Sequence, residues 1–216
     1  MTSSIPRQPP VTQAAAPRPA DARRKPHFRC RRGMAKCTMA MLLMLPVARL
    51  LALPPQPAIS LEYAVKATYL YKLAPFVNWP PGTFHSPDAP FDICVVGPDP
   101  FDDFLEKAVS GHTLDTHPFR IRRMETISAG DDCQIVFIGY AQPEKIRGAL
   151  QALQGQPALT VTDSRQPDVS GSIVQFVVRH GHVRFEIDNA AAARNHLVIS
   201  SKLLNLALAV KEAGRR

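Results

Sequence analysis

The chain has 216 residues and a formal net charge of +8, but its basic residues are concentrated at one end. Ten of its 26 Lys and Arg residues, and only one of its 18 acidic residues, precede residue 59, so the remainder holds 16 basic and 17 acidic residues, a net charge of −1. A nucleic-acid-binding domain needs clustered Lys and Arg on its own surface. The only local cluster is Arg120, Arg122 and Arg123, and its spacing indicates a solvated strand face, which argues against a nucleic-acid partner.

Residues 1–58 have the layout of an export signal. An uncharged apolar run, Thr38–Ala48, follows a basic stretch that ends at Lys36, and small residues and prolines continue to Ala58. This order is typical of a cleaved secretory signal. The run is shorter than the roughly 20 residues of a membrane span, so an uncleaved anchor is the weaker alternative. Because the preceding residues are rich in Pro, Ala, Ser and Arg, we expect translation to start at Met34.

The four cysteines divide between this leader and residues 59–216, which we expect to form one periplasmic domain. Cys30 and Cys37 lie in or before the signal, whereas Cys94 and Cys133 lie in the domain. A cysteine pair in an exported domain predicts a disulfide, because the periplasm is oxidising. Two separate buried thiols are the alternative. Neither cysteine has a CxxC partner or a His at ligand spacing, so a zinc site is not expected.

The first part of the domain alternates helices and strands. Ser60–Val77 is predicted as a helix capped by Ser60, with Pro75 kinking or ending it. A turn with the only Trp follows at residues 78–82. The next predicted elements are, in order, the strand Phe91–Gly97, the helix Phe101–Ser110, the strands Phe119–Met124 and Cys133–Gly139, the helix Glu144–Gln154 and the strand Ala158–Asp163. This alternation favours parallel crossovers with helices on both faces of a sheet.

The end of the domain follows a different pattern. The strands Ile173–Arg179 and His182–Ile187 flank His180-Gly181, which predicts a β-hairpin with a tight turn. A short helix is predicted over Asn189–Asn195, and a last helix runs from Ser200 or Ser201 to Val210 with leucines on more than one face. The sequence therefore predicts a single α/β domain with a mixed, mostly parallel sheet, helices on both faces, and a C-terminal β-hairpin followed by a helix.

Three segments of the domain resemble the YfiR family of small periplasmic proteins. The first is AVKATYLYKLAPFVNWP (Ala64–Pro80), and the second is the strand FDICVVG with its turn and helix, then CQIVFIG. The third, GSIVQFVVRHGHVRFEIDNAAAARNHLVISSKLLNLA (Gly171–Ala207), is the most specific. Their order and spacing cover nearly all of the domain.

The resemblance implies a regulator rather than an enzyme, with no cofactor. Members of this family restrain a partner, typically an inner-membrane diguanylate cyclase whose cytoplasmic product, cyclic di-GMP, drives biofilm formation. A homodimer is implied as well. Cys94 and Cys133 match one family disulfide, whereas the second disulfide of the best-known type has no counterpart, because no Cys follows Cys133. Pro75 also departs from the usual first helix.

The residues themselves give no constellation for catalysis. His180 and His182 form an H-x-H pair without an identifiable third metal ligand, which is typical of a solvated hairpin tip. The aspartates of Asp99–Asp103 precede a helix, where carboxylates favour the helix dipole. Ser200-Ser201 lacks a nucleophile-elbow context, and no G-x-G-x-x-G motif accompanies the strand that ends at Gly97.

Two classes of function therefore stay open. The first is an exported binding module that represses a membrane cyclase by preferring its inactive periplasmic state. Its candidate apolar contacts, which core packing explains about as well, are Phe76, Trp79, Leu203, Leu204 and Leu208. The second is a receptor for a small ligand that serves another membrane sensor. Its site would lie beyond the carboxyl ends of parallel strands, near Gly97, Asp99 and Gly139.

Overall fold

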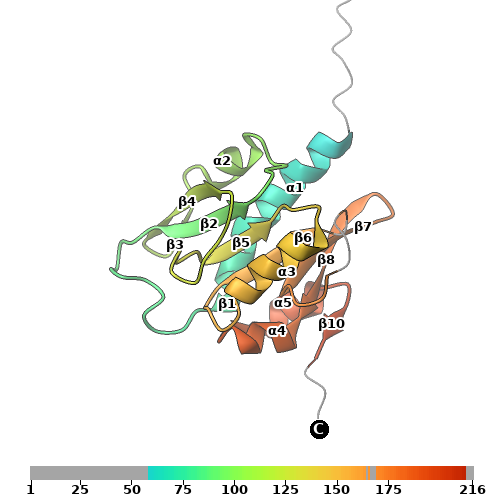
Figure 1. Cartoon of the computed structure of the whole chain (residues 1–216). Coiled ribbons are helices and arrows are strands. Elements are labelled where there is room, and N and C mark those ends of the chain that lie inside the picture. The colour runs from blue at the N-terminus through green and yellow to red at the C-terminus, as the bar shows by residue number, and fades with distance from the viewer. Residues whose placement is uncertain (1–57, 164, 166–168, 213–216) are drawn as a thin grey trace, which may run out of the picture. The chain divides into compact units, whose positions relative to one another are not determined.

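The structure is a computed structural model that describes residues 58–163, 165 and 169–212 (Figure 1). The predicted leader up to residue 57, with its two cysteines, lies outside the described residues. The helices are α1 (Ala58–Leu73), the 3-10 turn η1 (Ala74–Phe76), α2 (Phe104–Val109), α3 (Pro143–Ala152), α4 (Asn189–Arg194) and α5 (Ser201–Leu206). None of the helices in this described part has the length and apolar character that crossing a bilayer requires.

Ten strands accompany these helices in the described part of the chain. The strands are β1 (Val77–Asn78), β2 (Phe91–Val96), β3 (Thr113–Leu114), β4 (His117–Met124), β5 (Ile135–Ile138), β6 (Leu159–Asp163), β7 (Val174–Arg179), β8 (His182–Asp188), β9 (Val198–Ile199) and β10 (Val210–Lys211). β2, β5 and β6 are buried along their whole length, as expected of strands covered on both faces.

Eight of these strands form one sheet in the order β10-β8-β7-β6-β5-β2-β4-β3. Strands β7, β6, β5, β2 and β4 run parallel to one another. The pairs β7–β8 and β3–β4 are antiparallel, and β10 joins β8 in parallel. The predicted mixed, mostly parallel α/β sheet is therefore confirmed.

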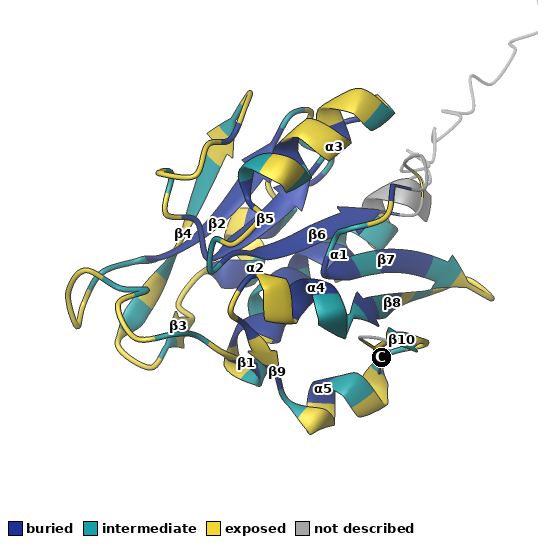
Figure 2. Ribbon diagram, turned by 60° about the horizontal axis from the view of Figure 1, so that its bottom comes forward, coloured by how far each residue is buried: buried dark blue, intermediate teal, exposed yellow. Residues whose placement is uncertain are grey.

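Helices cover both faces of this sheet, because the connections of the chain run in opposite directions from β2. It passes through α2 to β4 on one side of β2, then returns to the other side to form β5, α3 and β6. Side chains alternate along β2, so Ile93 and Val95 enter the larger core with α1 and α2, whereas Cys94 and Val96 enter a smaller core with α3. Figure 2 shows these buried strands lying between α3 and the α1 side of the sheet.

The hairpin of β7 and β8 forms as predicted. Both turn residues have positive φ, +51° at His180 and +77° at Gly181, which matches the turn geometry that suits the twist of paired strands. Phe176 and Phe185 face each other across the pair and reach the larger core.

The first helix differs from its prediction at both ends. It begins two residues before Ser60, which therefore is not its cap, and it ends at Leu73 rather than at Val77. Pro75 lies in the 3-10 turn that follows, consistent with a ring that cannot continue a helix interior. Val77 instead starts β1, which pairs antiparallel with β9 at Ile199.

The last helix is shorter than predicted. α5 ends at Leu206, and the extension to Val210 is wrong. The Leu208 N–H donates to the Phe185 carbonyl at 2.8 Å, and Val210 pairs with Ile187. An open edge of β8 offers unpaired backbone groups, and β-branched valine suits a strand. Edge pairing therefore outweighs the leucine pattern that predicted a longer helix.

Candidate functional site

The residues predicted to contact a partner differ in their exposure. Leu203 is 3% exposed and packs in the larger core. Phe76, Trp79 and Leu204 are half-buried against that core, and Leu208 is exposed. Leu203 is therefore unable to touch a partner without leaving the core, whereas the other four reach the surface to different degrees.

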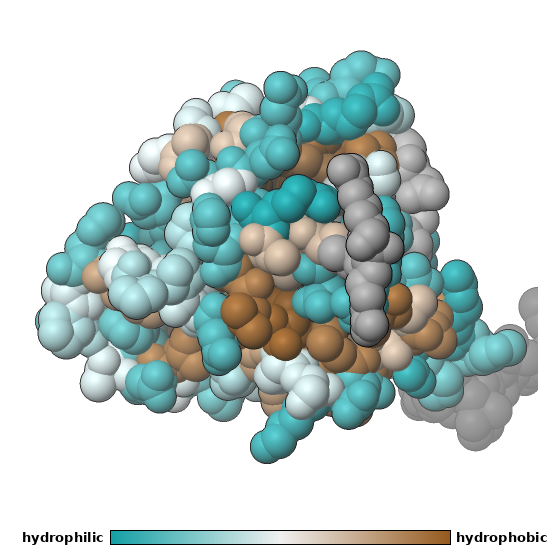
Figure 3. Space-filling view, turned by 90° about the horizontal axis from the view of Figure 1, so that it is seen from below, coloured by the Kyte–Doolittle hydropathy of each residue, from teal (hydrophilic) through white to brown (hydrophobic). Residues whose placement is uncertain are grey.

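Two exposed apolar side chains near the C-terminus were missed by the sequence prediction. Val198 and Leu206 are 61% and 58% exposed, and Leu208 is 42% exposed. We call these three residues the C-terminal apolar group. Figure 3, which views the molecule from below, shows hydrophobic side chains gathered on this face, toward which α5 and β10 lie in Figure 1. The leucine pattern, apolar on more than one helix face, was the available signal.

The predicted disulfide is present. Cys94 on β2 is joined to Cys133, just before β5, with Cα atoms 6.0 Å apart. The two strands are parallel neighbours, which brings the cysteines within bridging distance. Both cysteines are buried in the smaller core, so the bond ties two central strands together beneath α3.

A cluster of buried charges joins α1 to the carboxyl end of β6. Lys66 is completely buried, and its ammonium group donates to Asp163 Oδ2 at 2.5 Å and to Glu62 one turn earlier. The Tyr63 hydroxyl donates to the same Asp163 oxygen at 3.0 Å. Arg165 donates twice to Glu62, at 3.0 and 2.6 Å. These five residues, the buried charge cluster, combine two cationic and two anionic side chains.

The cluster shifts the titration of two of its members. Hydrogen bonds from Arg165 lower the pKa of Glu62 to about 2, against the opposing effect of burial and with help from Lys66. Burial, reinforced by Asp163, raises the pKa of Tyr63 and keeps its hydroxyl protonated as a donor. Because these groups bind one another, the cluster is suited to holding α1 on the sheet rather than to proton transfer.

A second charge cluster lies where β2 and β4 pair. Arg120 binds both carboxylate oxygens of Asp92, at 2.6 and 2.7 Å. Arg122 approaches the same carboxylate at 3.4 Å and donates to the Asp131 carbonyl at 2.5 Å. Gln134 accepts the Asp92 backbone N–H at 2.7 Å. The expected solvated arginine face is confirmed for Arg120, whose side chain is 56% exposed, and Arg122 is 32% exposed. Both arginines also contact a carboxylate that lies inside a buried strand.

The glycines predicted to border a ligand crevice do meet at the carboxyl ends of β2 and β5, where their own Cα positions are closely packed. A Cβ on Gly97, whose φ is +83°, would lie 2.5 Å from the Tyr140 ring, and one on Gly139 would collide with the backbone that follows Gly97. The Asp99 carboxylate accepts hydrogen bonds of 2.7 and 2.6 Å from within the fold. An open hollow of about 650 Å³ lies at this edge and is lined by Gly97, Tyr140 and residues of α3, so a ligand site here stays a prediction.

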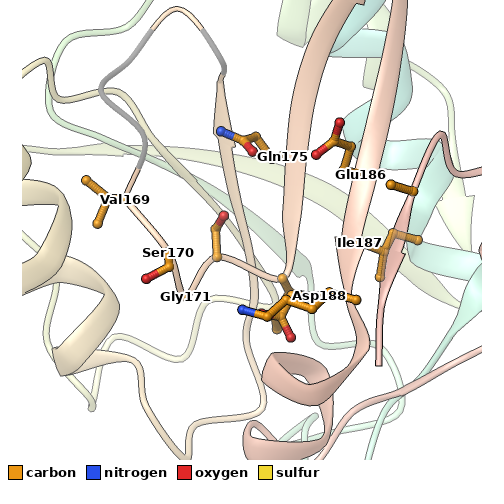
Figure 4. Close-up of a pocket in the computed structure, with 11 residues that line it drawn as sticks. Val169, Ser170, Gly171, Gln175, Glu186, Ile187 and Asp188 are labelled. Carbon is orange, nitrogen blue, oxygen red and sulfur yellow. The ribbon is translucent and has the colours of Figure 1, made fainter. Parts of the chain in front are cut away.

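A smaller hollow of about 270 Å³ lies where β10 joins the sheet (Figure 4). Gln175 and Glu186 are cross-strand partners on β7 and β8 and project side by side into it. Lys211 pairs with Asp188 at 3.3 Å. Such cross-strand and ion pairs are typical of a polar sheet face rather than of a reaction centre.

The remaining candidate residues have structural surroundings. His180 and His182 are exposed at the hairpin. The Ser200 hydroxyl accepts the Leu203 N–H at 3.3 Å and so caps α5, whereas Asp103 precedes α2 without a side-chain capping bond. Within the described ranges, no group of three His, Cys, Asp or Glu side chains is arranged to hold a metal ion.

Comparison with known protein families gives a match over most of the domain. A family model described as YfiR/HmsC-like matches residues 63–208, which include the disulfide, the second charge cluster and the C-terminal apolar group. No curated protein matches the chain. Proteins of this family are periplasmic regulators that act with membrane sensor proteins in cyclic di-GMP signalling. The match spans more than half of the chain and agrees with the three segments quoted from the sequence, so the chain belongs to the YfiR/HmsC-like family.

Proposed function

We propose that this protein is exported to the periplasm, binds the periplasmic sensory part of an inner-membrane diguanylate cyclase, and represses it. Membership of the YfiR/HmsC-like family over residues 63–208 is the observation that carries the proposal. Repression lowers cyclic di-GMP and with it biofilm formation. The protein acts by contact, as a homodimer, and not by catalysis.

The C-terminal apolar group gives this contact a physical basis. Val198, Leu206 and Leu208 keep between 42% and 61% of their surface in water. Fully burying one such side chain in an interface contributes about 1.5–3 kcal/mol. Phe76 lies beside this group in the fold, because its carbonyl accepts the Ser200 N–H at 2.9 Å. Apolar side chains on β9, α5 and the segment before β10 therefore supply the proposed surface.

Repression requires that the protein bind one state of the cyclase better than the other. A ligand with equal affinity for both states shifts no population, however tightly it binds. A repressor that prefers the inactive periplasmic conformation draws the cyclase toward that state and lowers its cytoplasmic output. The disulfide between Cys94 and Cys133 suits an oxidising compartment, where this contact would occur.

Two variants and a deletion test the proposal. Deleting the gene should raise cellular cyclic di-GMP, measured by mass spectrometry. Leu206→Glu places a charge in the C-terminal apolar group and should reproduce the deletion, with the protein still present and folded. Leu61→Glu is the matched control, because Leu61 is an equally exposed leucine, at 70%, on α1. This control should leave cyclic di-GMP at the level of the unaltered strain.

Each outcome has a defined meaning. Unchanged cyclic di-GMP in the deletion strain would reject the repressor function. A Leu206→Glu protein that represses normally would reject the C-terminal apolar group as the contact surface while leaving repression itself intact. Co-purification of the unaltered protein, but not the Leu206→Glu variant, with a membrane-bound cyclase would identify the partner directly.

A further inference from the structure

We propose that a cavity lined by two arginines binds a carboxylate group, at a site separate from the C-terminal apolar group. The cavity measures about 510 Å³ and lies where the amino ends of β2 and β5 meet β4. Its walls include the side chains of Phe84, Asp92, Arg120, Arg122, Asp131 and Asp132. Carboxylate binding at this cavity would be the same whichever membrane protein is the partner.

The cluster holds more positive charge than Asp92 requires. Arg120 binds both oxygens of that carboxylate, at 2.6 and 2.7 Å, which is the strongest geometry for such a pair. Arg122 reaches the same group only at 3.4 Å. Asp92 thus offers one negative charge to two guanidinium groups, and Arg120 alone satisfies it. Arg122 therefore keeps only a long contact with Asp92, and Asp131 and Asp132 are the other carboxylates on the same walls.

Both arginines are fixed in place yet retain unused donors. Arg122 uses Nη1 for the Asp131 carbonyl, at 2.5 Å, and for Asp92. Its Nε and Nη2 groups, and Nη1 of Arg120, have no acceptor in the part of the chain that the structure describes. The Arg122 side chain is 32% exposed. A partly exposed guanidinium that is anchored through one nitrogen presents a preorganised fork to an incoming anion.

Two further carboxylates on the cavity walls oppose a dianion more strongly than a singly charged ligand. The Asp131 carboxylate accepts the Ser128 N–H at 2.7 Å, and the Asp132 carboxylate bonds to His85 Nε2 at 3.2 Å. Asp131 is thus engaged within its own loop and Asp132 with a histidine of another loop, and their charge opposes a dianion such as phosphate. A planar carboxylate with one negative charge matches the guanidinium fork.

An aromatic wall favours an apolar group next to that carboxylate. The Phe84 ring lines the cavity and stacks on His117, with ring centroids 3.8 Å apart. An aryl or alkyl group would gain contact area against this wall. The ligand class is therefore an apolar monocarboxylate, and its source can be a free solute or an acidic side chain of another protein.

Nuclear magnetic resonance of the purified, 15N-labelled chain tests this assignment. Benzoate serves as the free-solute probe, and N-acetyl-aspartate N-methylamide as the side-chain probe. We expect the Nε–H resonances of Arg120 and Arg122 to shift and saturate with at least one of them. Benzamide, the neutral isostere of benzoate, should leave them unchanged. Arg147, an exposed arginine on α3 that contacts Glu144 at 3.4 Å, is the control residue.

Substitution identifies which arginine carries the binding. Arg122→Lys retains the charge but loses the planar fork, so the affinity for the probe should fall by about tenfold to a hundredfold. Arg147→Lys should leave it unchanged. The titration of the unaltered protein stands even if an arginine variant fails to fold.

Saturation by only one probe would support the site and assign its source. Shifts that rise without saturation, or that appear equally at Arg147, would reflect ionic strength and overturn the proposal. The absence of any shift would overturn it as well. Because no cyclase is present in this experiment, neither result decides the proposed repression.

Discussion

Replacing Lys66 by Met would show how strongly the buried charge cluster holds α1 on the sheet. Methionine fills a similar volume without a charge, and it leaves Asp163 bound by Tyr63 and Glu62 bound by Arg165. Removing one partner of a buried ion pair costs about 3–5 kcal/mol. The Lys66 side chain is 0% exposed and that of Asp163 is 1% exposed, so water cannot replace the lost ammonium. We expect the low end of this range, because the tyrosine hydroxyl remains.

Urea denaturation at neutral pH, followed by the fluorescence of Trp79, measures this loss. Lys72→Met is the matched control, since Lys72 is an exposed lysine on the same helix, and it should change the free energy of unfolding by no more than about 0.5 kcal/mol. In a double-mutant cycle with Asp163→Asn, the two losses should add up to more than the loss in the double variant. A cost below about 1 kcal/mol for Lys66→Met would falsify the assignment of α1 anchoring to this cluster.

Two further outcomes depend on contacts already described. The pKa of Glu62 is 4.5 in the unfolded reference and about 2 in the folded protein, so its contribution to stability is complete above pH 4.5 and is lost as the pH falls toward 2. Linkage gives at most about 3 kcal/mol, reduced because Arg165 is half exposed. Glu62→Gln should therefore flatten the pH dependence of unfolding in this window, and an unchanged slope would contradict the assignment. Cys94→Ser and Cys133→Ser should each lower stability by about 2–4 kcal/mol, and the double variant should add little, because both single changes break the same bond. Free thiols in periplasmic protein, detected by mass spectrometry, would count against the bridge.

Local patterns were sufficient for the central elements of the fold. β2, β5 and β6 are buried along their whole length because both of their faces are covered, although only β5 is apolar throughout. The hairpin is predicted from His180-Gly181 because a glycine readily adopts the positive φ that a tight turn needs, and both residues have a positive φ in the structure. The small sheet of β1 and β9 joins segments more than 100 residues apart through two residues on each strand. No local pattern predicts such a pairing, and the same holds for the edge contact that turns Val210 into a strand residue.

The charge clusters were missed because their partners are distant in sequence. Lys66 lies in a largely apolar helix segment, and Asp163 ends a fully buried strand 97 residues later. Asp92 likewise interrupts the apolar run of β2, and Arg120 follows 28 residues later. A charge within a buried segment needs a partner, so each position signals that a partner exists. Only the tertiary structure identifies it.

The residues that stabilise the fold and the residues proposed to contact a partner lie in different parts of the domain. The disulfide and the buried charge cluster fasten α1 and the central strands, and those strands are buried along their whole length. The C-terminal apolar group lies on β9 and α5, which have only two and six residues, and on the segment that leads to the two-residue β10. Short elements at an edge contribute few buried contacts and open at low cost. Substitutions in that group should therefore alter partner affinity with little effect on unfolding, whereas changes at Lys66 should reduce stability and function together.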